Sequence, residues 1–101
     1  MTDRIYQFQF APEVELEDIE ASIVLSLFAV ESLHGESQAL LDSAHCIDAR
    51  DRVLLIDIST QVGKDLARIF MGFLRREIPQ DCYNVKRIRP DDEPGFAPPN
   101  G

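Results

Sequence analysis

A single carboxylate interrupts the most apolar stretch of the chain. Asp57 follows Val53-Leu54-Leu55-Ile56 and precedes Ile58, in a run of branched residues typical of a strand inside a sheet. A buried acid with a raised pKa can take part in proton transfer, but the neighbouring residues offer no nucleophile paired with a base. We interpret Asp57 as a polar residue on an open sheet face or beside an arginine, with catalysis as the weaker alternative.

The residues that follow join this strand to a helix. In Ser59-Thr60-Gln61-Val62-Gly63-Lys64 the hydroxyl groups can cap a helix, and the free N–H groups of a helix start can hold an anion. The segment is only partly like a phosphate loop, because the leading glycine and the hydroxyl residue after the lysine are absent. Capping is the favoured interpretation, and a small anionic ligand is the alternative. The candidate polar or ligand-binding residues are Asp57, Thr60, Gly63, Lys64 and His45.

Cysteine and histidine are too sparse to predict a metal centre. Cys46 and Cys82 form no paired-cysteine motif, and His34 and His45 do not stand at ligand spacing from them. His45 and Cys46 are neighbours, but adjacent strand residues point to opposite faces and do not pair. We expect reduced, buried thiols, no metal and no cofactor. No residue is assigned a catalytic role, so the sequence favours a protein that is not an enzyme.

The charge is unevenly distributed along the chain, whose formal net charge is −8. Residues 1–51 are strongly acidic, whereas residues 52–89 contain more bases than acids. A net negative charge disfavours nucleic acid, which proteins bind largely through Lys and Arg on its phosphates. The last of the binding hypotheses is therefore a nucleic-acid surface made by the bases of the second half, Arg75, Arg76, Lys86, Arg87 and Arg89.

Composition predicts one soluble domain over residues 1–89, with 45% hydrophobic and 28% charged residues. The longest apolar-leaning run, residues 21–30, is shorter than the roughly 20 residues that span a bilayer, and the first residues lack a signal-peptide pattern. We expect a cytoplasmic protein without a membrane contact. Residues 90–101 are rich in proline, glycine and acid and predict a disordered tail.

Hydrophobic periodicity predicts the secondary structure. Aromatic residues alternate with polar ones over residues 4–10, and apolar residues recur at intervals of three and four over residues 15–34, ending before Gly35. Residues 36–47 are ambiguous between a strand and an extension of the helix. The other expected elements are a strand over 40–47, a strand over 52–58, a helix from Thr60 that stops before Pro79, and a strand over 82–89.

The order β-α-β-β-α-β predicts an α+β fold of the ferredoxin-like kind. In that arrangement a four-stranded antiparallel sheet of order 4-1-3-2 has two helices on one face. The helices would run antiparallel, which would bring the acidic start of the first close to Arg75 and Arg76. Both helices have apolar surfaces wider than one sheet contact requires, so each should have a second partner.

The sheet face without helices is the predicted interface. Alternation places Ile5, Val53 and Leu55 there with Gln7, Gln9 and His45, and exposed apolar patches usually mark association. The first hypothesis is a small non-catalytic interaction or regulatory module, acting as a homodimer or through another protein. The second is a domain that binds a small anionic ligand, at the start of the second long helix or in a dimer cavity. A small dimeric ferredoxin-like enzyme is the third.

Overall fold

The first strand, β1 (Ile5–Phe10), occupies an inner position in a four-stranded antiparallel sheet. The computed structural model describes residues 4–42 and 44–88. The observed strand order, β2-β3-β1-β4, is the predicted order read from the opposite edge, so the expected α+β fold is confirmed. The other strands are β2 (His45–Asp48), β3 (Val53–Asp57) and β4 (Tyr83–Ile88).

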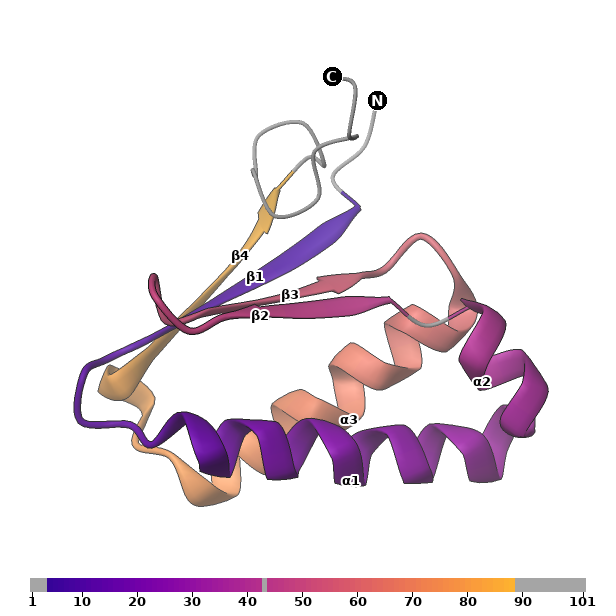
Figure 1. Ribbon diagram of the computed structural model, residues 1–101, viewed down its shortest axis with the longest axis horizontal. Coiled ribbons are helices and arrows are strands. Elements are labelled where there is room, and N and C mark those ends of the chain that lie inside the picture. The colour runs from indigo at the N-terminus through magenta and orange to yellow at the C-terminus, as the bar shows by residue number, and fades with distance from the viewer. Residues whose placement is uncertain (1–3, 43, 89–101) are drawn as a thin grey trace.

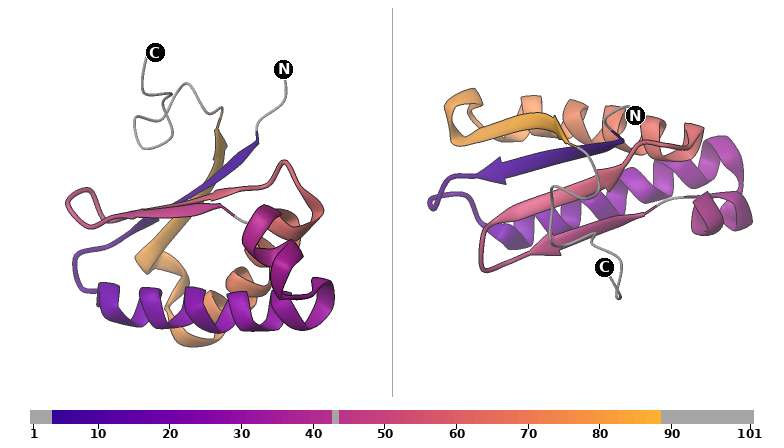
Figure 2. Two further views of the ribbon diagram at one scale, coloured as in Figure 1. Left: turned by 45° about the vertical axis from the view of Figure 1, so that its right-hand side comes forward. Right: turned by 90° about the horizontal axis from the view of Figure 1, so that it is seen from above.

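The helices cover one face of this sheet (Figure 1). Seen from above, α1 (Leu16–His34) lies on the β2 side and α3 (Gln61–Glu77) on the β4 side (Figure 2). A 3₁₀ turn, η1 (Gln80–Cys82), leads into β4.

The ambiguous segment after α1 contains both a helix and a strand. A separate short helix, α2 (Glu36–Asp42), precedes β2, which is shorter than the predicted strand over 40–47. Gly35 lies between α1 and α2 with a φ of 88°, a left-handed conformation that favours glycine, and its N–H donates to the carbonyl of Glu31. The glycine therefore ends α1, as predicted, and allows the chain to turn into a second helix.

The main core lies between the sheet and the two long helices. Phe8 of β1 and Phe70 of α3 are fully buried, and their rings meet edge to face with centroids 5.1 Å apart. Buried side chains from β3, α1 and α3 complete this layer: Leu54, Ile56, Ile19, Ile23, Val30, Leu66 and Leu74. The one buried polar side chain on α1, Ser26, donates to the carbonyl of Ser22 at 2.8 Å. The core therefore leaves this hydroxyl satisfied.

The β2–β3 hairpin is tied to the loop between β1 and α1. Asp48 Oδ1 accepts hydrogen bonds from the N–H groups of Arg50 and Asp51, which closes the tight turn between β2 and β3. Arg52 follows with a φ of 58°, and its guanidinium donates to the carbonyls of Ala11 and Val14. One arginine therefore links two loops that are distant in sequence.

The two long helices run antiparallel, as predicted, and Asp18 near the start of α1 lines a groove with Glu77 at the end of α3. The acidic start of α1 therefore lies near the end of α3, although it makes no ion pair with Arg75 or Arg76 among the described residues. Across residues 4–42 and 44–88 the only ion pair joins His34, at the end of α1, to Asp65, near the start of α3. The predicted tail, residues 90–101, and Arg89 lie outside the described residues. Within the described part of the chain, no helix has the length and apolar character needed to cross a membrane.

Candidate functional site

The turn before α3 is a capping structure. Thr60 Oγ1 accepts a hydrogen bond from the N–H of Gly63 at 2.9 Å, so one of the free donors of the helix start is occupied. A Cβ on Gly63 would lie 1.9 Å from the carbonyl oxygen of Asp57, which explains the glycine by close packing of helix on strand. The favoured capping interpretation agrees with these contacts.

Asp57 belongs to the same turn. Its Oδ1 accepts a hydrogen bond from the N–H of Ser59 at 2.8 Å, and its register partner is Ile5, on the face away from the helices. The half-buried carboxylate therefore shapes the exit from β3. Of the five candidate polar residues, the structure brings Asp57, Thr60 and Gly63 together.

His45 lies on the other face of the sheet. It pairs in register with Ile56, a residue of the core beneath the sheet, so its side chain faces the helices and not the helix-free face where it was predicted. The difference arises because β2 begins only at His45, and its alternation could not be aligned from sequence. Burial lowers the pKa of this half-buried imidazole below its ordinary value, which favours the neutral form.

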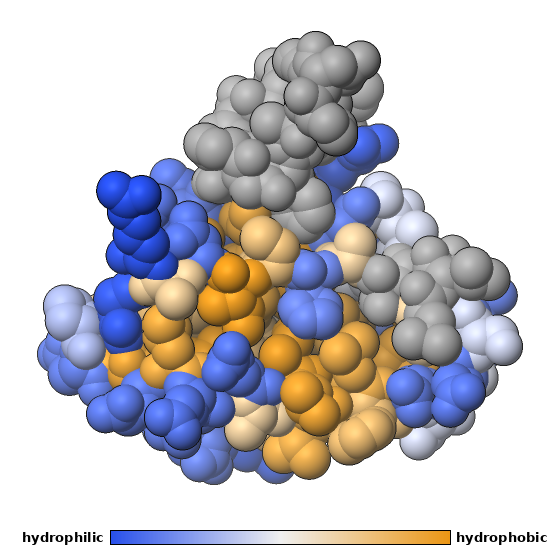
Figure 3. Space-filling view, viewed as in Figure 1, coloured by the Kyte–Doolittle hydropathy of each residue, from blue (hydrophilic) through white to orange (hydrophobic). Residues whose placement is uncertain are grey.

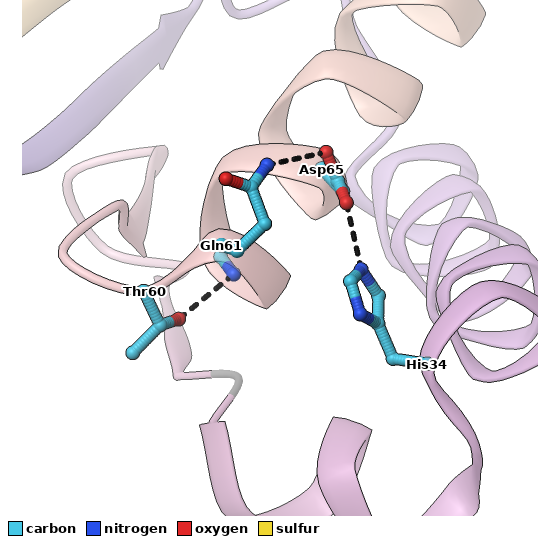
Figure 4. A network of polar contacts seen from close by, with 5 residues as sticks. His34, Thr60, Gln61 and Asp65 are labelled. Carbon is cyan, nitrogen blue, oxygen red and sulfur yellow. Dashed lines mark hydrogen bonds and ion pairs between the residues drawn. The ribbon is translucent and has the colours of Figure 1, made fainter.

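A small polar network links the two long helices (Figure 4). His34 Nε2 and Asp65 Oδ2 are 2.7 Å apart, and Gln61 Nε2 donates to Asp65 Oδ1 at 3.1 Å. The hydrogen bond from His34 is the main effect that holds the pKa of Asp65 below its usual range. At the level of the sequence His34 is considered only as a metal ligand, and nothing there indicates this carboxylate, because the contact spans 31 positions.

The helix-free face of the sheet contains a second cluster. Ile5 and Leu55 are each 1% exposed and Val53 is 7% exposed, with Cys46 and Ile88 packed against them. Gln7 of β1 lies on the same face, paired in register with Leu55 of β3 on one side and Lys86 of β4 on the other. The three aliphatic side chains of the predicted interface thus share a face, as expected, but they are buried in a single chain. An interface on the helix-free face would therefore be formed by the polar residues around this cluster.

A cleft lined by four cations opens between α3 and the β1–β4 pair. Its volume is about 320 Å³, and Lys64, Arg68 and Arg75 line it from α3 while Arg87 lines it from β4. We call it the cationic cleft. Its other lining residues are uncharged: Tyr6, Ile58, Met71 and Gly72. Arg87 lies over the ring of Tyr6, 5.5 Å from its centroid.

Sequence reasoning found the parts of this cleft but not the whole. Lys64 was a ligand candidate, and Arg75 and Arg87 were assigned to a nucleic-acid surface. The interval from Lys64 to Arg68 to Arg75 marks one side of a helix, which is a signal available in the sequence. The contribution of β4 depends on its pairing with β1, where Tyr6 is opposite Arg87, and that pairing is not a local property.

The outward side of α1 is unusually apolar. The exposed large hydrophobic residues of the described chain all belong to this helix: Val24 at 46%, Leu25 at 52%, Phe28 at 59% and Leu33 at 66%. Val24, Leu25 and Phe28 lie within about 100° of one another around the helix axis, whereas Leu33 is about 140° from Phe28. We call the first three the α1 patch. Apolar side chains gather over the middle of α1 and between α1 and β2 (Figure 3).

A groove between α1 and α3 adjoins the α1 patch. Its volume is about 360 Å³, and Leu25, Phe73 and Ile78 supply its apolar lining. Two carboxylates, Asp18 and Glu77, also line it. The sequence of α1 contains further acids and no lysine or arginine. The α1 patch and its groove therefore form an apolar surface with an acidic border.

The two cysteines belong to opposite edges of the sheet. Among the described residues Cys46 and Cys82 are in no disulfide, and both are half-buried, on β2 and just before β4. Burial, with smaller effects from Asp81 and Glu13, raises the pKa of the Cys82 thiol, which disfavours the reactive thiolate. Among residues 4–42 and 44–88, no three His, Cys, Asp or Glu side chains are grouped to hold a metal ion.

The chain matches no protein-family model, and comparisons with curated proteins and with solved structures also give no match.

Proposed function

We propose that this protein is a small non-catalytic interaction module that binds a partner protein over the α1 patch. The observation that carries the proposal is the concentration of large exposed hydrophobic side chains on one helix. A helix that is apolar on both its core side and its outer side is usually covered twice. The sheet and α3 cover the inner side, so the outer side is available to a partner.

The border of the α1 patch defines the chemistry of the partner. Glu17, Glu20 and Glu31 flank the patch on α1, and Asp18 and Glu77 line the adjoining groove. Charge complementarity favours a partner with basic groups around an apolar centre. An amphipathic helix with lysine or arginine beside its apolar stripe meets both requirements, because it can lie along α1 and insert a side chain into the groove.

A pair of synthetic helical peptides tests this proposal. Both carry the same apolar stripe, and the flanking positions are lysine in one and glutamate in the other. We expect the lysine peptide to bind the wild-type chain at least about tenfold more tightly at low salt, measured by fluorescence anisotropy. Equal binding of the two peptides, or binding of neither, would contradict the proposal.

Two variants of equal charge locate the binding surface. Phe28→Asp places a carboxylate in the α1 patch and should weaken binding of the lysine peptide at least about tenfold, because it inserts a charge into the apolar contact. Leu33→Asp is the matched control, since Leu33 is also exposed but lies on another side of α1. Circular dichroism checks that both variants fold. A similar loss in both would place the interaction elsewhere.

A homodimer remains part of this proposal, as the second possible use of the apolar surface. Light scattering on the wild type and on Phe28→Asp distinguishes a second copy of this chain from another protein as the partner of the α1 patch. A dimer that the substitution dissociates would identify a second copy on the α1 patch. A dimer that survives it would favour the sheet face or an edge strand, as predicted from Ile5, Gln7, Val53 and Leu55.

The finer structural and cellular assignments belong to the same proposal. The order of the four strands and the position of α1 and α3 on one face support a ferredoxin-like arrangement with α2 inserted. We place the protein in the cytoplasm, since Cys46 and Cys82 are not joined in a disulfide and a reducing compartment keeps thiols in that state.

A further inference from the structure

We propose that the cationic cleft binds a small organic phosphate, a ligand with at least two negative charges on an apolar or planar body. This inference is independent of the α1 patch. It concerns a different surface, between α3 and the β1–β4 pair, and it assigns a ligand class to a site of defined volume.

The lining of the cleft is strongly basic. Four of the chain's ten lysine and arginine residues line it, although the chain as a whole has 18 acidic residues. None of the lining residues is acidic, and in residues 4–42 and 44–88 none of these four cations takes part in an ion pair. Like charges that line one cleft repel, and a bound anion reduces that repulsion. The arrangement is unfavourable for the empty protein and favourable for a complex.

The types of cation indicate phosphate. A guanidinium presents a planar fork of N–H donors that matches two oxygens of a phosphate, and a lysine adds a compact charge. Arg87 lies over the Tyr6 ring, and an arginine stacked in this way keeps its in-plane donors available to an anion. Three arginines and one lysine can therefore neutralise a phosphate or a diphosphate from several sides.

The uncharged lining residues indicate an organic body. Ile58, Met71 and the ring of Tyr6 supply apolar contact, and the volume of about 320 Å³ is at the lower end of the range for small-molecule sites. Gly72 also lines the cleft, and a Cβ at this position would project into open space, with nothing within 4 Å. A glycine inside a helix costs stability relative to alanine, and at this position the missing side chain leaves space beside the cations.

Thermal unfolding and calorimetric titration on the full chain test the proposal. The probes are inorganic phosphate, pyrophosphate, a nucleoside diphosphate, a sugar bisphosphate and a dicarboxylate. We expect at least one organic phosphate to bind at least tenfold more tightly than inorganic phosphate and the dicarboxylate. At 100 times its Kd it should raise the unfolding midpoint by roughly 10 °C. No binding by any phosphate below the millimolar range would overturn the proposal.

Two charge variants separate the cleft from general electrostatics. Arg68→Gln with Arg75→Gln removes two lining cations and should weaken organic phosphate binding by about 100-fold. Arg76→Gln, compared with Arg75→Gln alone, is the control of equal charge, since Arg76 neighbours Arg75 on α3 and is exposed but does not line the cleft. We expect it to change the Kd less than about threefold. An equal loss from Arg76→Gln would show diffuse attraction and overturn the assignment.

A steric variant tests the cavity without changing charge. Gly72→Leu should fill the cleft and weaken binding at least tenfold, while the chain stays folded because the new side chain enters open space. Unchanged affinity in Gly72→Leu would overturn the proposal. So would tighter binding of a single-stranded oligonucleotide than of any small phosphate, which would identify a nucleic-acid surface. Phe28→Asp should leave phosphate binding unchanged, so the two proposals can fail separately.

Discussion

The two long helices of this protein are alike on their inner sides and differ on their outer sides. Both bury an apolar side against the sheet and each other. On α3 the side facing away from α1 has lysine and arginine around a glycine, whereas the outer side of α1 is apolar with acids at its border. Since a stable fold needs only the inner sides, the contrast on the outer sides is where binding is to be sought.

The largest expected effect compares two phenylalanines, one on the inner side of α3 and one on the outer side of α1. Phe70→Ala should lower the free energy of unfolding by about 3–5 kcal/mol, because it removes a fully buried ring in contact with Phe8. Phe28→Ala should change it by less than about 0.5 kcal/mol, since Phe28 is mostly exposed. Urea unfolding measures both. A large loss from Phe28→Ala would mean that the α1 patch is structural.

The next comparison is between the two glycines of α3. Gly63→Ala should destabilise by about 1–3 kcal/mol, because the new Cβ would collide with the carbonyl oxygen of Asp57. Gly72→Ala should stabilise by up to about 1 kcal/mol, because alanine favours the helix and the space is open. Thermal unfolding gives both values. Destabilisation by Gly72→Ala would show that the cleft is narrower than described.

A pH series examines the contact that joins the two helices. The pKa of Asp65 is lower in the folded chain than its ordinary value, so its contribution to stability is present above the pKa of the unfolded chain. It is lost as the pH falls through the lower, folded pKa. Asp65→Asn should therefore cost up to about 1 kcal/mol at neutral pH and less in acid. A cost that does not change with pH would show that the charge of Asp65 contributes nothing to this contact.

The smallest expected effect concerns repulsion in the cationic cleft. Arg75→Gln should stabilise the unliganded chain by a few tenths of a kcal/mol at low salt, because it removes one of four like charges. At about 1 M salt, where screening acts within about 3 Å, the gain should disappear. Arg76→Gln is the control. A loss of stability in Arg75→Gln at low salt would indicate that the arginine has a structural partner.

Much of the fold could be predicted from the sequence, because its periodicities are local. The aromatic alternation of β1 and the apolar spacing of α1 and α3 indicated these elements within a few residues. The connection between α1 and β3 was harder. Seven residues are too few to show a helical period, so α2 was not separated from the strand after it. That uncertainty also placed His45 on the wrong face.

The candidate sites were less predictable, because their residues meet through tertiary contacts. Thr60 and Gly63 form a local turn and were identified together. The cationic cleft needs the register of β4 on β1, and the contact between His34 and Asp65 needs the approach of two helix ends. The burial of Leu55 on the helix-free face was also unforeseen, since alternation indicates a face but not what covers it.

The inner position of β1 has a consequence for how the chain is made. Ile5 pairs with Asp57 of β3 on one side and with Ile88 of β4 on the other. The first of these four strands in the sequence therefore pairs with the third and the fourth. β1 is synthesised several seconds before both of its neighbouring strands. Its aromatic side chains and the apolar residues of α1 lack their core partners during that interval, and apolar surface exposed in this way is prone to aggregation.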